Sequence, residues 1–190
     1  MNNIQKYFAV IDTETNWSDS VMSIGVVIAE KATFKAVDKK YYIITPECNS
    51  GGMYSSVLDL KNVKVSLKEK RKNVMSDLIN TLESYDIDSI FAYNANFDCK
   101  HMKELNKYKW FDIMRLAAYK QYNKAIPEDA QCCKTGRLKS GFGVEPVMNM
   151  LLGSQDYKEV HNALCDAVDE LKIMKLLGHK IEKYDIALIK

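Results

Sequence analysis

Short apolar runs separated by polar turns dominate the chain. Runs that are rich in β-branched and aromatic residues predict buried strands. We expect strands at Phe8–Asp12, Ile24–Ala29, Tyr41–Thr45, Ser89–Tyr93 and Lys109–Ile113. Short connections join the first three of them, which indicates an antiparallel meander.

Helices are indicated by capping residues and by apolar residues at helical spacing. A helix is expected from Ser66 to about Tyr85, because Ser66-Leu67-Lys68-Glu69 has the form of a capping box. Its core-facing residues are Val74, Leu78 and Leu82. The other helices are expected from the Asn94–Asp98 turn to about 105, over 114–122, over 144–152, and from near Asn162, where the apolar stripe is Leu164, Val168, Leu171 and Met174. Alternating helices and strands after the meander indicate a mixed sheet with helices on its faces.

The composition is that of one globular domain. With 190 residues, of which 47% are apolar, the chain is long enough for one well-packed core and short for two. We therefore expect a single domain over residues 1–190. Lysine and arginine number 27 against 25 aspartates and glutamates, which gives a net charge of +2. This balance excludes the strong positive field of nonspecific duplex binders, so a polyanionic partner would be held locally.

No segment indicates export or membrane insertion. Residues 1–7 lack an apolar signal core, and the apolar strand Ile24–Ala29 is too short to span a bilayer. The cysteines are odd in number and include no C-x-x-C, which argues against a disulfide framework and a zinc ribbon. These features predict a cytoplasmic protein with reduced thiols and no membrane contact. They assign no role to the adjacent Cys132 and Cys133.

Two carboxylates close the first predicted strand. Side chains two residues apart in a strand point to the same face, so Asp12 and Glu14 should project together. Two like charges at about 4 Å repel by about 4 kcal/mol near a protein surface, so such a pair favours a cationic partner. Mg²⁺ and Mn²⁺ prefer carboxylate oxygens and are the natural candidates. For an isolated D-x-E motif, the alternative is a strand that ends in two solvated acids.

Three further candidates lie later in the chain. Asp98 follows the strand expected at 89–93, and α/β sheets gather their ligands at the carboxyl ends of strands. Asp166 lies about 200° around the last helix from Leu164, so it should fall outside the apolar stripe and face a cleft. His161 precedes Asp166 by five residues, on the loop before the helix or at its first residue. Each of the three, taken alone, is also compatible with an ordinary surface or core position.

Three motifs stand in order along the chain: D-x-E at the end of the first strand, N-x-x-F-D after the fourth, and H-x-A-x-x-D-A at the last helix. They are Phe8 to Thr15, Asn94 to Asp98 and His161 to Ala167. Together they resemble the DEDD-type 3′-to-5′ exonucleases, a group that includes polymerase proofreading subunits, ribonuclease T and oligoribonuclease. The resemblance covers most of the chain. A histidine five residues before the last aspartate indicates the histidine branch, DEDDh.

The resemblance implies a ribonuclease-H-like α/β fold, with a mixed five-stranded sheet flanked by helices. It also implies two divalent cations, Mg²⁺ or Mn²⁺, which stabilise the attacking and leaving oxygens of phosphodiester hydrolysis. The implied metal ligands, which are also catalytic, are Asp12, Glu14, Asp98 and Asp166. His161 is the implied general base, because a neutral imidazole with an ordinary pKa of about 6.5 accepts a proton near neutral pH. The expected reaction releases nucleoside 5′-monophosphates from a free, mainly single-stranded 3′ end of DNA or RNA.

Residues around these motifs are candidates for holding the substrate. Single strands are bound by stacking of bases on aromatic side chains and by basic grooves. The candidates for contacts with the terminal nucleotide are Thr13, Thr15, Trp17, Met22, Asn94 and Phe97. Core packing is the alternative, above all for Phe97. Lys134, Arg137 and Lys139 are the better candidates for phosphates, whereas the basic run from Lys61 to Lys72 is typical of a solvated helix face.

Two other functions are alternatives to this one. A nucleic-acid-binding module without catalysis is disfavoured, because all four acids and the histidine are present. A metal-dependent hydrolase of short oligonucleotides or small nucleotides stays open, since the near-zero net charge leaves little surface for long polyanions. The sequence also leaves open whether DNA or RNA is preferred, and whether a polymerase or a second copy of the chain is a partner.

Overall fold

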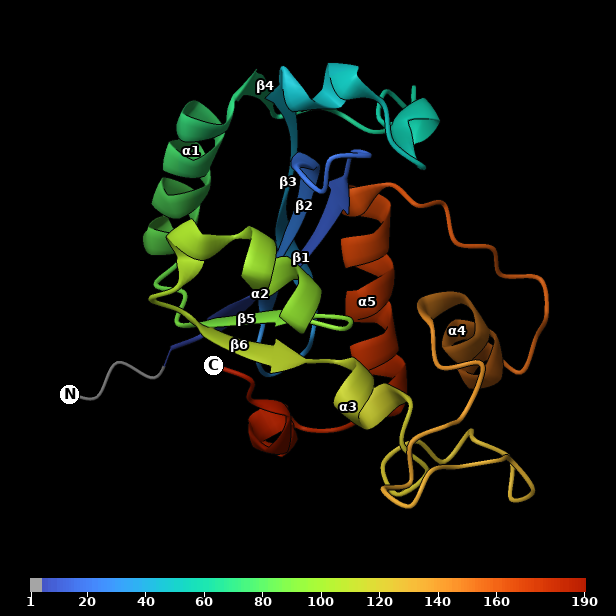
Figure 1. The fold of residues 1–190 in the computed structure, drawn as a ribbon. Coiled ribbons are helices and arrows are strands. Elements are labelled where there is room, and N and C mark those ends of the chain that lie inside the picture. Colours follow the sequence, from blue (N-terminus) through green and yellow to red (C-terminus); the bar gives the residue numbers. More distant parts are fainter. Residues whose placement is uncertain (1–4) are drawn as a thin grey trace.

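The structure is a computed structural model that describes residues 5–190. A six-stranded sheet forms its centre. The strands are ordered β4-β3-β2-β1-β5-β6 across the sheet (Figure 1). They are β1 (Tyr7–Thr15), β2 (Val21–Glu30), β3 (Ala36–Thr45), β4 (Leu67–Lys70), β5 (Ser89–Ala92) and β6 (Lys109–Asp112). The first three form the predicted antiparallel meander, whereas β4, β5 and β6 each join a neighbour in parallel. The α/β class and the mixed sheet are confirmed.

Helices cover both faces of this sheet (Figure 1). On one face lie α1 (Arg71–Ser84) and α2 (Asn96–His101), and on the other lie α3 (Met114–Ala117), α4 (Val144–Leu152) and α5 (Ala163–Leu177). Short 3₁₀ turns lie at Glu47–Ser50, Ser55–Val57, Lys103–Leu105 and Ile181–Ala187. Among residues 5–190, no helix combines the length and the apolar character needed to cross a bilayer.

The sheet has one strand more than the five expected, because residues 67–70 do not begin a helix. They form β4 beside β3, and α1 begins only at Arg71. Ser66 has another partner: its Oγ accepts a hydrogen bond from the Tyr41 N–H at 3.1 Å, and its own N–H donates to the Tyr41 carbonyl at 2.7 Å. The expected capping box is therefore wrong, since Ser66 extends the sheet. The core-facing residues of α1 are confirmed as Val74, Leu78 and Leu82.

Three other helix predictions need correction, although α4 and the start of α5 match the expected positions. The helix expected to run to about 105 ends at His101, and residues 103–105 form a separate 3₁₀ turn. The helix expected over 114–122 ends after about one turn, at Ala117. The predicted stripe of α5 is rotated, because Leu164 and Val168 are only half-buried. The buried residues of α5 are Ala163, Asp166, Ala167, Glu170, Leu171, Ile173 and Met174. Two acids lie on the buried face, whereas a pattern of apolar residues assigns acids to the exposed side.

Candidate active site

β1 delivers the D-x-E pair to the face of the sheet that α5 covers. Phe8 and Val10 pack in the core beneath α5, whereas the residues between and after them belong to the core beneath α1. Successive side chains of a strand point to opposite faces of the sheet, so Asp12 and Glu14 project on the same side as Phe8 and Val10, the side that α5 covers. Both side chains are half-buried. The pair therefore projects toward the helix that carries Asp166.

A glycine allows the start of α5 to approach the sheet. Gly25 of β2 is paired with Asp12 of β1, and a Cβ at Gly25 would lie 2.0 Å from the carbonyl oxygen of Ala163. Only a residue without a side chain permits this approach. The first turn of α5 therefore lies against β2 next to Asp12, and Asp166 in that turn is buried at the same site.

Asn162 caps α5 and fixes the loop that carries His161. Its side-chain oxygen accepts a hydrogen bond from the Leu164 N–H at 3.2 Å, and its amide donates to the Val57 carbonyl at 2.8 Å. These bonds tie the start of α5 to the loop after β3. His161 has a left-handed backbone, with φ of 59°, and its ring stacks on Tyr54 of that loop. The ring centroids are 4.1 Å apart and the planes differ by 13°.

Asp98 reaches the site from α2. Its side chain is buried, and its Oδ1 accepts a hydrogen bond from Thr13 Oγ1 at 2.7 Å. The turn that leads into α2 is held by Asp112 of β6, whose Oδ1 accepts hydrogen bonds from the N–H groups of Asn94 at 2.9 Å and Met114 at 3.0 Å. Because β1, β5 and β6 are parallel neighbours, their carboxyl ends bring Asp98 beside the D-x-E pair.

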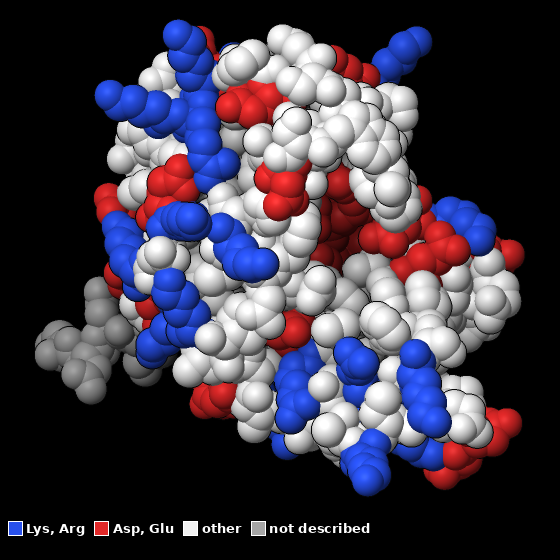
Figure 2. All heavy atoms as spheres, in the orientation of Figure 1, with Lys and Arg blue, Asp and Glu red and all other residues white. Residues whose placement is uncertain are grey.

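The five candidate catalytic residues line one cleft of about 340 Å³: Asp12, Glu14, Asp98, His161 and Asp166. Figure 2 shows a hollow in which acidic atoms gather. The other residues that line the cleft are Thr13, Thr15, Asn16, Trp17, Met53, Tyr54, Tyr93, Asn94, Phe97 and Glu159. Within residues 5–190, no lysine or arginine lines it. The cleft therefore concentrates negative charge without a cationic side chain to balance it.

Burial and mutual repulsion shift the pKa values of these acids upward. Loss of water raises the pKa of Glu14 and of Asp166 to about 8, and neighbouring acids add to the effect. Burial raises the pKa of Asp98 to about 7. The pKa of Asp12 is also raised, first by burial and then by the surrounding carboxylates. Without a cation, several of these groups therefore hold a proton near neutral pH.

The donor set of the cleft fits a divalent cation. Asp12 Oδ2 and Asp166 Oδ1 are buried and have no hydrogen-bond partner. Glu14, His161 and Asp166 each offer a ligand atom, and these atoms lie within 4.8 Å of one another. Carboxylate oxygens are the ligands of Mg²⁺ and Mn²⁺, and a bound cation would offset the repulsion among the acids.

The predicted substrate residues fall into three groups. Four line the cleft beside the acids: Thr15, Trp17, Asn94 and Phe97. The Trp17 side chain is 70% exposed, which leaves its ring accessible to a ligand. Thr13 also lines the cleft, but it is buried and its hydroxyl is bonded to Asp98. Met22 is fully buried in the core and does not line the cleft.

Several acidic and aromatic residues in or next to the cleft, among them Tyr93, were not expected as site residues from the sequence. Tyr54 and Glu159 line the cleft from the loop after β3 and the segment before α5. Their placement depends on loop conformation, for which the sequence carries no local signal. Glu170 is fully buried on α5. Its spacing of four residues from Asp166 was a usable signal, because residues i and i+4 share one face of a helix.

The two groups of basic residues differ in their relation to the cleft. In the run from Lys61 to Lys72, Arg71 donates a hydrogen bond to Glu104 at 2.8 Å. In the group of Lys134, Arg137 and Lys139, the Arg137 side chain lies over the Phe142 ring, 5.0 Å from its centroid. The Phe142 carbonyl in turn accepts a hydrogen bond from the hydroxyl of the cleft residue Tyr93 at 2.6 Å. Basic side chains also gather over the segment between α3 and α4 in Figure 2. Arg137 is therefore linked to the edge of the cleft through Phe142.

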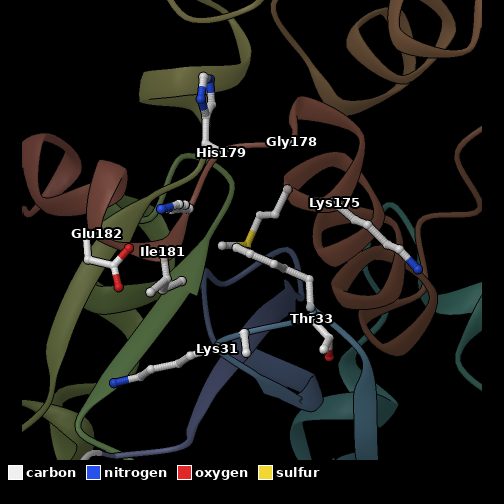
Figure 3. Close-up of a pocket in the computed structure, with 11 residues that line it drawn as sticks. Lys31, Thr33, Lys175, Gly178, His179, Ile181 and Glu182 are labelled. Carbon is white, nitrogen blue, oxygen red and sulfur yellow. The ribbon is translucent and has the colours of Figure 1, made fainter.

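A second pocket lies at the other end of α5 (Figure 3). Its lining includes Lys31, Thr33, Lys175, His179 and Glu182. The His179 ring is held there by the carbonyl of Tyr122 at 2.7 Å. None of the site residues predicted from the sequence lines this pocket. The residues predicted from the sequence therefore identify the acidic cleft, and not this pocket, as the candidate active site.

The raised pKa values predict how the metal-free protein responds to pH. In the unfolded chain Glu14 and Asp166 regain ordinary pKa values near 4, so between about pH 4 and pH 8 the folded state binds more protons. Stability should therefore fall as pH rises through this range. Thermal unfolding in EDTA should show a lower Tm at about pH 8 than at about pH 5, and Mn²⁺ should restore most of the loss. A Tm that rose with pH in EDTA would contradict this account.

Comparison with known proteins supports the fold. No protein-family model matches this sequence, and no curated protein sequence matches it. The nuclease domain of 3′hExo, a DEDDh family member bound to rAMP, superposes with a TM-score of 0.66 at 14% identity, over 100% of this chain and 99% of that one. E. coli exonuclease I with a 5cy-dT13 oligonucleotide gives 0.63 at 12% identity, over 96% of this chain and 42% of that one. Exonuclease X in complex with 5′ overhanging duplex DNA superposes with a TM-score of 0.56 at 19% identity, over 95% of this chain and 99% of that one. The chain therefore has the fold of the DEDDh-family exonuclease domains.

Proposed function

We propose that this chain is a metal-dependent 3′-to-5′ exonuclease. The observation that carries the proposal is the convergence of four acids and one histidine in a single cleft: Asp12, Glu14, Asp98, Asp166 and His161. That cleft stands on a fold shared with DEDDh-family exonucleases. The substrate is a single-stranded or frayed 3′ end of DNA or RNA, and the product is a nucleoside 5′-monophosphate.

Mg²⁺ or Mn²⁺, with two ions per site, is the proposed cofactor. Asp12, Glu14, Asp98 and Asp166 would hold the ions, since all four line the cleft and two of them have buried oxygens without partners. When bound, the ions stabilise negative charge on the attacking and leaving oxygens of a phosphodiester. A zinc-bound form of E. coli ExoI with single-stranded DNA is among the structures that resemble this chain.

His161 is the proposed general base. A water oxygen bonds to phosphorus, and the bond from phosphorus to the 3′ oxygen of the preceding nucleotide breaks. His161 accepts the proton that the attacking water loses, and the departing 3′ oxygen takes a proton from solvent water to become the new 3′-hydroxyl. His161 then returns its proton to the solvent. The stack on Tyr54, with centroids 4.1 Å apart, restrains the orientation of the His161 ring.

The terminal nucleoside would be held by the aromatic residues of the cleft. Trp17 and Phe97 both line it and are exposed, and stacking of a base on an aromatic ring contributes about 1–3 kcal/mol. Thr15 and Asn94 offer polar contacts beside them. Because no lysine or arginine among residues 5–190 lines the cleft, phosphates farther along the strand would be held outside it. The basic residues proposed for that role are Lys134, Arg137 and Lys139.

The requirement for a 3′ end tests the proposal. Single-stranded DNA and RNA, labelled at the 5′ end, should shorten stepwise in Mn²⁺ and release mononucleotides. A 3′-phosphate should block the reaction strongly, because the cleft accepts only a terminal nucleoside. A circular single strand of the same sequence is the control and should persist. Rapid cutting of the circle would identify an endonuclease instead.

Hydrolysis of short oligonucleotides or small nucleotides is the second candidate function. The cleft volume of about 340 Å³ is at the lower end of the range for small-ligand sites, which favours a short substrate. Rates on a dinucleotide and on a longer oligonucleotide separate the two functions. A preference for the dinucleotide would favour the second candidate.

A further inference from the structure

Glu170 is a buried carboxylate that the proposed reaction does not use. It lies on α5 and is 1% exposed. Its Oε2 has no hydrogen-bond partner, and within residues 5–190 it forms no ion pair with a basic side chain. A buried carboxylate is costly unless a cation or hydrogen bonds compensate it. Glu170 therefore requires a source of compensation.

The helix directs Glu170 toward the acids of the cleft. Residues four apart share one face of a helix, so Glu170 lies one turn beyond Asp166 on the buried face of α5. Helix α5 packs against β1 (Figure 1). Of the neighbouring charges, Glu170 has the largest effect on the pKa of Asp12, and Asp98 has the largest effect on the pKa of Glu170. Glu170 is not among the residues that line the cleft. Glu170 therefore lies behind the surface of the cleft, one turn of α5 beyond Asp166.

The charged side chains with the largest effects on the pKa of Glu170 are all acidic. They are Asp98 from α2, Asp166 from α5 and Glu159 from the segment before α5. The backbone N–H of Tyr93, directly after β5, acts in the opposite direction and lowers this pKa. Attraction between opposite charges is several times stronger in such a site than in water. A divalent cation held by the acids of the cleft would supply a compensating charge.

We propose that Glu170 is a fifth carboxylate of the divalent-cation site, and that it acts on the bound cation from behind the cleft, one turn of α5 beyond Asp166. This inference rests on the proposed function, because it deepens the metal site described there. Glu170 lies behind the cleft and touches no substrate, so it is a positioning residue. Its charge strengthens cation binding and balances ions that the four cleft acids alone would hold less tightly.

The test is Glu170→Gln, which removes the charge and keeps the size of the side chain. Mn²⁺ binding to the full chain, measured by calorimetry, should weaken about 10- to 100-fold. The metal-free variant should unfold at a higher temperature than the wild type, because one of several like charges is gone. Glu182→Gln is the matched control, since it makes the same charge change at an exposed residue of the second pocket. This control should bind Mn²⁺ as the wild type does.

Glu170→Asp separates charge from packing. It keeps the carboxylate but leaves a gap, so a charge role predicts Mn²⁺ affinity closer to wild type than that of Glu170→Gln. A packing role predicts the reverse order, and that order would overturn the inference. Wild-type Mn²⁺ affinity in Glu170→Gln would also overturn it. A wild-type chain that binds no Mn²⁺ would overturn the proposed function as well, whereas one that binds Mn²⁺ without cutting nucleic acid would overturn only the proposed reaction.

Discussion

Asp12→Asn is expected to reduce nuclease activity by orders of magnitude. Asp12 lines the cleft, and the pKa of its carboxyl is raised by burial and by four other acids. Its Oδ2 is buried and has no hydrogen-bond partner among residues 5–190, so it is available to a cation. Replacing it with an amide removes charge that would hold the proposed ions, which would stabilise the reacting oxygens when bound. The measurement is the rate of mononucleotide release from single-stranded DNA and RNA at saturating Mn²⁺.

The same variant should fold normally. In EDTA, its Tm should equal or exceed that of the wild type, because one member of a repelling cluster is neutral. Asp185→Asn is the matched control, because Asp185 is exposed and does not line the cleft. This substitution should change neither activity nor Tm. Full wild-type activity in excess EDTA, or an unchanged rate for Asp12→Asn, would reject the metal-dependent reaction.

The fold was predictable where local pattern and tertiary packing agree. The apolar runs of β1, β2 and β3 and the bounds of α4 follow from residues close together in sequence. The prediction failed at Ser66, because a capping serine and a sheet-extending serine look alike until Tyr41 is placed beside it. It also failed for the orientation of α5, since burial of Asp166 and Glu170 reflects the site rather than the hydrophobic pattern.

The candidate catalytic residues were identifiable because each stands in a short motif. The contacts that bring these residues together could not be identified from the sequence. One of them, the approach of α5 to the sheet, is possible because Gly25 has no Cβ. Tyr54 owes its place to long-range bonds, such as that from Asn162 to the Val57 carbonyl at 2.8 Å. Met22 was expected in the loop after the first motif, but β2 already begins at Val21, so Met22 is a strand residue in the core.

His161→Ala is expected to lose about 10²- to 10⁴-fold in kcat, the usual size of a general-base contribution. The His161 ring lies within 4.8 Å of ligand atoms of both Glu14 and Asp166, so the geometry allows two roles. A base would affect the rate and leave Mn²⁺ affinity intact. A metal ligand would affect Mn²⁺ affinity first, and its rate would recover when Mn²⁺ is raised.

Both quantities, kcat and its Mn²⁺ dependence, should be measured for His161→Ala over a range of pH. A base contributes to the chemical step itself, so the rate loss of His161→Ala should persist at every pH tested when Mn²⁺ is saturating. His179→Ala is the matched control, because His179 lies in the second pocket at the other end of α5. A near wild-type rate in His161→Ala, or full recovery at high Mn²⁺, would show that another group accepts the proton.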